Sequence, residues 1–316
     1  MMMSKCLYCY QPIEERGDYH EKCSKSFFGT SLPPQLEYTF SEMEMLAKEA
    51  VERSITITGV QAKLSMGVVK TTANTSDQRL TVLDALGGSY IFKPPSKQFE
   101  GMSEVEHVTM KIAQAYGLST VPCSLIRLAS GELSYITRRV DRTKKGEKTH
   151  MIDMFQITEA FDKYRSSMEK IGKAINQYSN QPLLDNIYFF ELSVFSFLTG
   201  NNDMHLKNFS LINSANGWVL APAYDLLNVN VLLPEDEEEL ALTLKGKRKK
   251  LKRDHFESFG IELGLNQRQI NGVFKRMIKN FSKALEALDQ SFLSESLKEK
   301  YKEVLGIKYK QLGLLD

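Results

Sequence analysis

Three polar side chains near the middle of the sequence have the types and spacing that one kind of chemistry requires. The segment 200–210, GNNDMHLKNFS, contains Asp203 and Asn208, and Asp225 follows at the end of Pro-Ala-Tyr-Asp. An acid that orients a hydroxyl, a carboxamide shortly after it and a second, metal-binding acid are the groups used in phosphoryl transfer from a metal nucleotide. We therefore predict that Asp203 acts on the acceptor hydroxyl and that Asn208 and Asp225 bind a metal ion. The alternative is an Asn/Asp-rich turn whose side chains only cap backbone groups.

The elements on either side would hold these groups in place. Residues 183–199 are apolar enough for a buried helix, which Gly200-Asn-Asn would end. Residues 209–212 and 218–220 predict a β-hairpin that carries the chain toward the second acid. His205 lies inside the polar segment, and it is predicted either to orient the transferred phosphate or to hold the loop backbone.

Two upstream segments have the chemistry of the other half of such a site. Tyr90-Ile-Phe-Lys93 is typical of a short strand, which the two prolines after it would end. Lys93 is then either a phosphate contact or a lysine whose stem lies along the sheet edge. Ser103 is a candidate N-cap of the helix that follows, and Glu106 either completes a capping box or forms an ion pair with Lys93. Both alternatives remain open.

Residues 54–64 alternate β-branched and small polar residues around Gly59. This pattern is typical of a strand that enters a tight turn, and such a turn can lie over phosphates. It matches neither the GxGxxG nor the GxxxxGK[ST] pattern of known phosphate-binding loops. Alone, the segment is therefore weak evidence for a phosphate-binding loop, and it supports one only together with the other segments.

These segments occur in the order found in HipA-type toxin kinases, and the sequence resembles that family over roughly residues 50–310. The matching stretches are 56–63, 92–94, 104–106, 139–142, 153–156, 202–209 and 224–225. The most specific of them is NDMHLKNF at 202–209. Because few residues precede the 56–63 loop, the sequence looks most similar to the short HipT-type toxin of three-gene systems, in which a separate small protein supplies a missing domain.

The resemblance implies an ATP- and Mg²⁺-dependent serine/threonine protein kinase of a bacterial toxin–antitoxin system. It implies a protein substrate in translation, such as an aminoacyl-tRNA synthetase, and antitoxin partners of the HipB or HipS type, with DNA contacted only through them. Asp203 would be the catalytic base, Asn208 and Asp225 the Mg²⁺ ligands, and Lys93 the phosphate-binding lysine. The candidate nucleotide-binding residues are Lys93, Thr58, Gly59, Gln61, Lys63, Glu106, Arg139 and Gln156. The candidate sites of autophosphorylation are Thr56, Thr58 and Ser54.

Two other classes of function fit the same residues. One is a small-molecule or lipid kinase on the same scaffold, which shares every catalytic group and differs only in its acceptor. The other is a non-catalytic, zinc-dependent binding module. Transfer of labelled phosphate to a protein favours the protein kinase, whereas failure to bind ATP and Mg²⁺ favours the binding module.

A separate cluster of reactive side chains lies at the start of the sequence. Cys6-Leu-Tyr-Cys9 and His20-Glu-Lys-Cys23 are two pairs with two-residue gaps, which is the spacing of a tetrahedral Cys3His zinc site. A knuckle this small cannot bury a core, so we expect a structural Zn²⁺ to supply most of its folding free energy. The alternative is two inert thiol pairs in a reducing compartment.

Composition and charge limit the remaining possibilities. The chain has 316 residues, of which 42% are hydrophobic, and its formal net charge is +2. This balance argues against a dedicated nucleic-acid binder, and we expect a cytoplasmic protein with no membrane contact. The acidic run at 235–239 is expected to be an exposed loop or a helix start. The basic run at 245–253 is expected to be a solvated turn or a patch that attracts the substrate.

Together these patterns predict an α+β chain with a two-lobed, protein-kinase-like fold. The predicted divisions are a zinc knuckle over residues 1–30, a β-rich N-lobe over 31–142 and a mainly helical C-lobe over 143–316. In the C-lobe, residues 240–244 are expected to form a strand, and residues 266–288 and 292–312 two long amphipathic helices.

Overall fold

A computed structural model gives the structure of residues 4–14, 17–53, 63–70, 78–83, 87–143 and 145–316. The chain forms two compact units. Unit 1 comprises residues 1–107, 121–146 and 290–292, and unit 2 comprises residues 108–120, 147–289 and 293–316. The division passes through helix α3 (Met102–Ala115), after His107. The boundaries predicted at residues 30 and 142 stay predictions.

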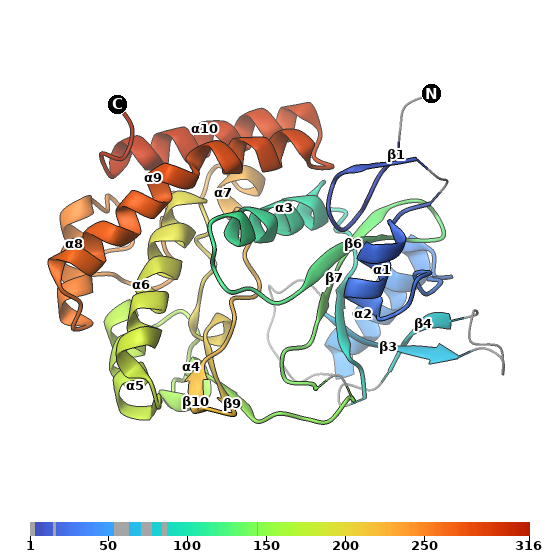
Figure 1. Ribbon diagram of the computed structural model, residues 1–316, viewed down its shortest axis with the longest axis horizontal. Helices are drawn as coiled ribbons and strands as arrows, with labels where there is room; N and C mark the ends of the chain where they lie inside the picture. Colours follow the sequence, from blue (N-terminus) through green and yellow to red (C-terminus); the bar gives the residue numbers. More distant parts are fainter. Residues whose placement is uncertain (1–3, 15–16, 54–62, 71–77, 84–86, 144) are drawn as a thin grey trace. The chain divides into compact units, whose positions relative to one another are not determined.

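The centre of unit 1 is an antiparallel sheet of five strands in the order β4-β3-β5-β7-β6 (Figure 1). The strands are β3 (Leu64–Lys70), β4 (Gln78–Val82), β5 (Tyr90–Lys93), β6 (Cys123–Arg127) and β7 (Leu133–Arg138). The β3–β4 and β6–β7 pairs are both antiparallel hairpins. A shorter pair, β1 (Ser4–Lys5) with β2 (Pro12–Ile13), belongs to the amino-terminal knuckle.

One face of this sheet packs against two helices. Helix α1 (Glu21–Phe28) and helix α2 (Phe40–Arg53) share one buried apolar cluster with the strands, which includes Phe27, Phe28, Met43, Met66, Leu80, Tyr90, Phe92 and Ile136. Neighbouring side chains of a strand point to opposite faces, so Phe92 in this core leaves Lys93 on the other face. The apolar packing of β5 therefore determines where its lysine points.

Unit 2 is mainly helical. Its helices are α4 (Met154–Ile157), α5 (Met168–Tyr178), α6 (Pro182–Leu198), α7 (Val229–Leu232), α8 (Arg253–Glu262), α9 (Gln267–Gln290) and α10 (Glu295–Gln311), with a 3-10 turn at Leu206–Asn208. A small antiparallel sheet in the order β10-β9-β8 consists of β8 (Met151–Asp153), β9 (Ser210–Ser214) and β10 (Gly217–Leu220). The predicted hairpin and the two predicted long helices near the end of the chain are therefore confirmed.

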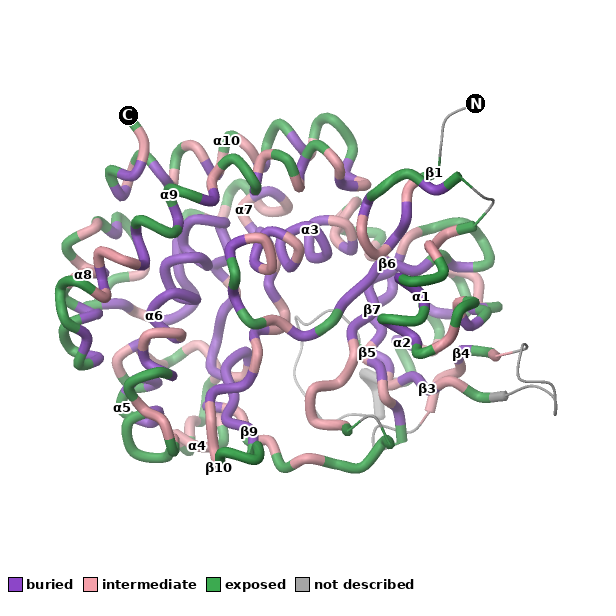
Figure 2. The backbone as a smooth tube through the Cα atoms, in the orientation of Figure 1, coloured by how far each residue is buried: buried purple, intermediate pink, exposed green. Residues whose placement is uncertain are grey.

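Helix α6 is the buried helix that the apolar run predicts. Every residue from Phe189 to Leu198 is buried (Figure 2). The charge of Glu191 within it is compensated by an ion pair of 2.7 Å with Arg276 of α9. Gly200 has a φ of 63°, in the left-handed region that glycine tolerates, so the helix ends and the polar segment follows at once. Among the described residues, no helix has both the length and the apolar character needed to cross a membrane.

Residues 240–244 do not form the predicted strand. They are mostly buried but irregular apart from isolated bridges, and the charged runs on either side of them pair with each other. Arg248 lies 3.4 Å from Glu238, and Lys249 lies 2.8 Å from Glu237. Glu239 is buried and pairs with Lys308 at 2.8 Å. The prediction of an exposed acidic loop or helix start is therefore wrong at Glu239, because an internal lysine compensates its charge.

Candidate active site

Lys93 and Glu106 form a buried ion pair in unit 1. The Lys93 Nζ and Glu106 Oε1 atoms are 2.6 Å apart, and the two side chains are 4% and 1% exposed. The ring of Tyr135, which is the cross-strand neighbour of Lys93, has its centroid 5.4 Å from the ammonium. Burying two charges costs free energy that their mutual attraction barely recovers. The pair therefore adds little to the stability of unit 1.

This ion pair decides between the two structural alternatives for Glu106, while the role of Lys93 as a phosphate contact stays a prediction. Helix α3 begins at Met102, and the Val105 N–H donates to the Gly101 carbonyl, so Ser103 lies inside the helix and not at its N-cap. The buried Ser103 hydroxyl has no hydrogen-bond partner in the part of the chain that the structure describes. The predicted capping box is therefore wrong, and Glu106 is the partner of Lys93.

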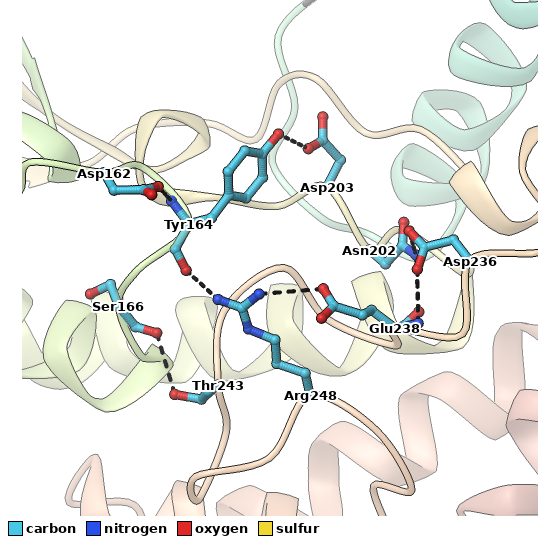
Figure 3. Close-up of polar contacts among 9 residues, drawn as sticks. All are labelled: Asp162, Tyr164, Ser166, Asn202, Asp203, Asp236, Glu238, Thr243 and Arg248. Atoms are coloured by element: carbon cyan, nitrogen blue, oxygen red, sulfur yellow. Dashed lines mark hydrogen bonds and ion pairs between the residues drawn. The ribbon is translucent and has the colours of Figure 1, made fainter. Parts of the chain in front are cut away.

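In unit 2, Asp203 lies just beyond the end of α6. Its Oδ1 accepts a hydrogen bond from the Tyr164 hydroxyl at 2.8 Å (Figure 3). Burial, and after it the negative charge of Asp203, raises the pKa of the Tyr164 hydroxyl well above its usual range. The more distant charge of Asp225 acts in the same direction. Tyr164 therefore stays protonated and fixes one oxygen of the Asp203 carboxylate.

Asn208 closes the loop that begins at Asp203. The Asn208 amide nitrogen donates to the Asp203 carbonyl at 3.1 Å, and the Asn208 N–H donates to the His205 carbonyl at 2.9 Å. The amide oxygen of Asn208 is then the side-chain atom left for a cation. Amide and carboxylate oxygens are ligands that suit Mg²⁺.

Asp225 has an unusual backbone conformation. Its φ is 62°, in the left-handed region that few residues other than glycine adopt. The preceding Tyr224 anchors the segment, because its hydroxyl contacts the Ser210 hydroxyl at 2.6 Å and donates to the Lys207 carbonyl at 3.0 Å. Backbone strain of this kind collects where one side chain must point in a fixed direction. Here that side chain is the predicted metal-binding acid.

His205 connects the 200–210 segment to a neighbouring loop. Its ring is 6% exposed, and its Nε2 lies 3.0 Å from the Nζ of Lys163. The ring also meets that of Tyr164 edge-on, with centroids 5.1 Å apart. The Leu206 N–H donates to the Lys163 carbonyl at 3.2 Å. These contacts favour the second of the two predicted roles, in which the histidine holds the loop.

A polar network connects the 200–210 segment and Tyr164 to the two charged runs (Figure 3). The Asn202 amide nitrogen donates to Asp236 Oδ2 at 3.0 Å and to the Glu238 carbonyl at 2.9 Å. The Arg248 guanidinium donates to the Tyr164 carbonyl and forms the ion pair with Glu238. The charged runs therefore support the backbone around Asp203.

Four metal-binding side chains converge in the amino-terminal knuckle. The donor atoms of Cys6, Cys9, His20 and Cys23 all lie within 4.8 Å of one another. His20 Nδ1 is 3.4 Å from Cys9 Sγ and 3.7 Å from Cys23 Sγ. Ligands about 2.0 to 2.3 Å from one tetrahedral zinc ion would be about 3.5 Å apart. The His20 Nε2 donates to the Pro12 carbonyl at 2.9 Å, so Nδ1 presents its lone pair to the sulfurs. The donor set thus fits a zinc ion.

The thiols of this cluster lie close enough to change one another's pKa. Burial, and after it the charge of Cys6, raises the pKa of the Cys23 thiol to about 12. Burial acts in the same direction on Cys6, but backbone N–H groups outweigh it and lower the pKa of that thiol. Three thiolates this close repel one another, and a divalent cation among them removes that repulsion.

Comparison with known protein families identifies the family to which the chain belongs. A model of the HipA-like C-terminal domain matches residues 55–285. The chain belongs to this family. A Haemophilus influenzae protein named "Putative kinase" is 27% identical to this HipA-family chain, and the match covers 89% of the chain and 88% of the relative. The Sinorhizobium fredii protein "Putative kinase Y4dM" is 29% identical, with 82% of the chain and 64% of the relative covered.

Solved structures show the fold of the HipA-family chain. The HipA of Shewanella oneidensis, in a complex with HipB and operator DNA, aligns with a TM-score of 0.69 at 20% identity, covering 89% of this chain and 73% of that one. The Helicobacter pylori proinflammatory kinase CtkA aligns with a TM-score of 0.52 at 15% identity, covering 71% and 87%. The predicted α+β, kinase-like fold and the predicted family are therefore confirmed.

The remaining predicted nucleotide-binding residues of this HipA-family member have local partners or lie outside the described residues. Arg139 forms an ion pair with Asp141 at 2.8 Å. Gln156 completes a capping box at the start of α4 with Asp153, whose side chain accepts from the Gln156 N–H at 2.8 Å. Lys63 is exposed next to β3. The positions outside the described residues are Ser54, Thr56, Thr58, Gly59 and Gln61. The roles assigned to all of these residues stay predictions.

Reasoning from the sequence missed Tyr164 and Lys163. They lie between α4 and α5 and contact Asp203 and His205, which follow about forty residues later. No spacing rule connects residues that folding alone brings together. The available signal was an aromatic and basic pair in an otherwise polar connection.

Proposed function

We propose that this protein is an ATP- and Mg²⁺-dependent kinase that transfers the γ-phosphoryl group of ATP to a serine or threonine hydroxyl of a protein. The observation that carries the proposal is the buried Lys93–Glu106 ion pair, found in the same HipA-family chain as Asp203, Asn208 and Asp225. In kinases, a lysine held by a helix glutamate binds the nucleotide phosphates. The relatives that are named as kinases support the same reaction.

Each residue has one task in the proposed reaction. Lys93 binds the phosphates, and Glu106 keeps its ammonium in one orientation. Asn208 and Asp225 supply oxygen ligands, and a bound Mg²⁺ would supply neutralisation of the phosphate charge. Asp203 orients the acceptor hydroxyl and takes its proton, while Tyr164 holds the carboxylate in place. The rate enhancement then comes from positioning and charge neutralisation.

The proposal extends to the biological setting that the resemblance implies. The protein would be a short HipT-type toxin that acts in the cytoplasm on a translation component, such as an aminoacyl-tRNA synthetase. Antitoxins of the HipB or HipS type would bind it, and it would meet DNA only through them. The Shewanella HipA solved with HipB and operator DNA supports a partner of this kind.

Two further parts of the proposal concern ligands and modification. The Cys6, Cys9, His20 and Cys23 cluster would bind a structural Zn²⁺, and its support is the convergence of the four donor atoms. The chain would also phosphorylate itself at Ser54, Thr56 or Thr58. The support for this part of the proposal is the resemblance of the 56–63 segment to the corresponding segment of HipA-type kinases.

The test is transfer of label from γ-labelled ATP to proteins of a bacterial lysate, with and without Mg²⁺. The wild-type protein is expected to label a protein band, and Asp203→Asn is expected to lose at least about a hundredfold in rate, because general-base catalysis contributes 10²–10⁴-fold in typical enzymes. Asp254→Asn, at an exposed acid in the first turn of α8, is the control and keeps the wild-type rate.

Three outcomes contradict the proposal in different ways. Equal labelling by wild type and Asp203→Asn would remove Asp203 from the reaction. Label that appears only in the small-molecule or lipid fraction would identify a kinase of the other class. No binding of ATP with Mg²⁺ to the wild-type protein would point to a non-catalytic binding module.

A further inference from the structure

The amino-terminal knuckle is bonded to the edge strand of the unit 1 sheet. The Leu125 N–H of β6 donates to the Leu7 carbonyl at 3.2 Å, and the Ser124 hydroxyl donates to the same carbonyl at 3.3 Å. The Tyr19 hydroxyl donates to the Leu125 carbonyl. These bonds attach the knuckle to β6, which lies at the opposite edge of the sheet from β4.

Another contact of the knuckle reaches helix α3. Tyr10 directly follows Cys9, and its hydroxyl lies 2.8 Å from His107 Nδ1, with the two rings edge-on at 5.2 Å. His107 is fully buried and is the next residue after Glu106. The ring of His107 also packs against Tyr135, whose own ring lies below the Lys93 ammonium. One hydrogen bond therefore links the cysteine loop to the turn of α3 that carries Glu106.

The direction of the Tyr10 side chain depends on a tight turn around the first two cysteines. The Tyr10 N–H donates to the Cys6 carbonyl at 2.9 Å, and the Cys6 N–H donates to the Gln11 carbonyl at 2.9 Å. Tyr10 has a φ of 66°, in the left-handed region, which tyrosine rarely adopts. Such a conformation persists only where the surrounding structure enforces it. A metal ion bound by Cys6 and Cys9 would enforce it, because both ends of the turn would be fixed to one ion.

We propose that zinc in the knuckle controls the nucleotide-binding residues of unit 1. With Zn²⁺ bound, the Cys6–Tyr10 turn holds Tyr10 on His107, and this contact keeps Glu106 paired with Lys93. Without the metal, Tyr10 leaves the left-handed region, the start of α3 loosens and the ion pair separates. Tyr10 and His107 are positioning residues in this scheme. The inference rests on the proposed function only in taking Lys93 as the lysine that binds ATP phosphates.

The first test measures the coupling without any nucleotide. Zinc is removed from the purified full chain with a chelator that prefers Zn²⁺ to Mg²⁺, and metal content is checked by elemental analysis. Amide hydrogen exchange is expected to become at least about tenfold faster at residues 90–93 and 102–107, to stay unchanged in α5 and α6, and to recover when Zn²⁺ is returned. Unchanged exchange at residues 102–107 after metal removal would overturn the proposal.

The second test keeps the metal in place and removes one hydroxyl. Tyr10→Phe loses the bond to His107 but retains a ring against Phe292, whose centroid is 5.7 Å away. Tyr19→Phe is the matched control, because it loses a knuckle hydroxyl that bonds β6 and not α3. With zinc content unchanged in both, the KM for ATP is expected to rise about five- to tenfold in Tyr10→Phe and less than about twofold in Tyr19→Phe, with kcat within about twofold of wild type.

The two tests separate this inference from the proposed kinase activity. Equal KM values for Tyr10→Phe and Tyr19→Phe would show that the contact to α3 does not act on the nucleotide, which would overturn the inference while the kinase proposal stands. If the zinc-loaded wild-type protein binds no ATP but exchange in α3 still depends on zinc, the kinase proposal fails and the coupling between the knuckle and α3 stands.

Discussion

At the scale of residues, the Tyr164 hydroxyl holds one oxygen of the Asp203 carboxylate. Tyr164→Phe keeps the ring packed against His205 and removes only the 2.8 Å hydrogen bond. We expect kcat to fall about tenfold with the KM for ATP within about twofold, because the Asp203 oxygen then loses the hydrogen bond that orients it toward the acceptor hydroxyl in the proposed reaction. Steady-state kinetics measure both constants. Tyr178→Phe, at a tyrosine of α5 that is 48% exposed, is the control. A higher kcat in Tyr164→Phe would contradict this prediction, because it would mean that the hydrogen bond hinders the action of Asp203.

The sequence was sufficient to propose some of the site residues and not others. Asp203, Asn208 and Asp225 could be proposed from the sequence because phosphoryl transfer requires certain residue types in a certain order along the chain. Tyr164 and Tyr10 were not, because each acts on a side chain that only folding brings near. Tyr164 is 39 residues from Asp203, and Tyr10 is 97 residues from His107.

At the scale of elements, the end of α6 determines where the polar 200–210 segment begins. Gly200 has positive φ, and a Cβ there would lie 2.7 Å from the Asn228 amide oxygen and 2.9 Å from a methyl carbon of Val304. Gly200→Ala is therefore expected to lower the free energy of unfolding by about 1 to 3 kcal/mol, because both strain and overlap oppose the methyl group. Chemical denaturation measures the change.

The matched control for this substitution is Gly272→Ala in α9. A Cβ at Gly272 meets no heavy atom closer than 3.9 Å. Alanine in a helix interior is favoured over glycine by about 0.5 to 1 kcal/mol, so this variant is expected to be more stable than wild type. An equal loss of stability in both alanine variants would show that the position at the end of α6 has no special role.

A helix or strand could be predicted from the sequence where its pattern of apolar residues is compatible with a single kind of secondary structure. The run 183–199 is long and apolar, and only a buried helix satisfies its backbone. The short apolar run 240–244 also fits the pattern of a strand, yet it forms only isolated bridges among the described residues. The Thr243 N–H donates to the Ser166 carbonyl at 3.3 Å, and the Met168 N–H donates to the Thr243 carbonyl at 2.9 Å, whereas Leu244 exchanges hydrogen bonds with the nearby Lys247. Helix α2 was missed because no pattern noted in the sequence predicts it.

At the scale of the whole molecule, the proposed self-phosphorylation would change how the protein binds ATP. A phosphate on Ser54, Thr56 or Thr58 adds about two negative charges to the segment that we predict to lie near the ATP phosphates. Like charges repel, so phosphorylated protein is expected to bind ATP at least about tenfold more weakly than unmodified protein. Phosphopeptide mapping of the wild-type protein after incubation with ATP and Mg²⁺ is expected to find phosphate between residues 54 and 65.

The Asp203→Asn variant identifies the source of that phosphate. If the chain modifies itself, Asp203→Asn carries no phosphate between residues 54 and 65, and it binds ATP as tightly as unmodified wild-type protein. The same phosphopeptide in Asp203→Asn expressed alone would mean that a host enzyme adds it, which contradicts self-silencing. If the modified residue is Ser54 or Thr56, neither of which is a predicted nucleotide contact, its replacement by alanine is expected to preserve kinase activity during incubation with ATP, while the wild-type protein loses activity as phosphate accumulates.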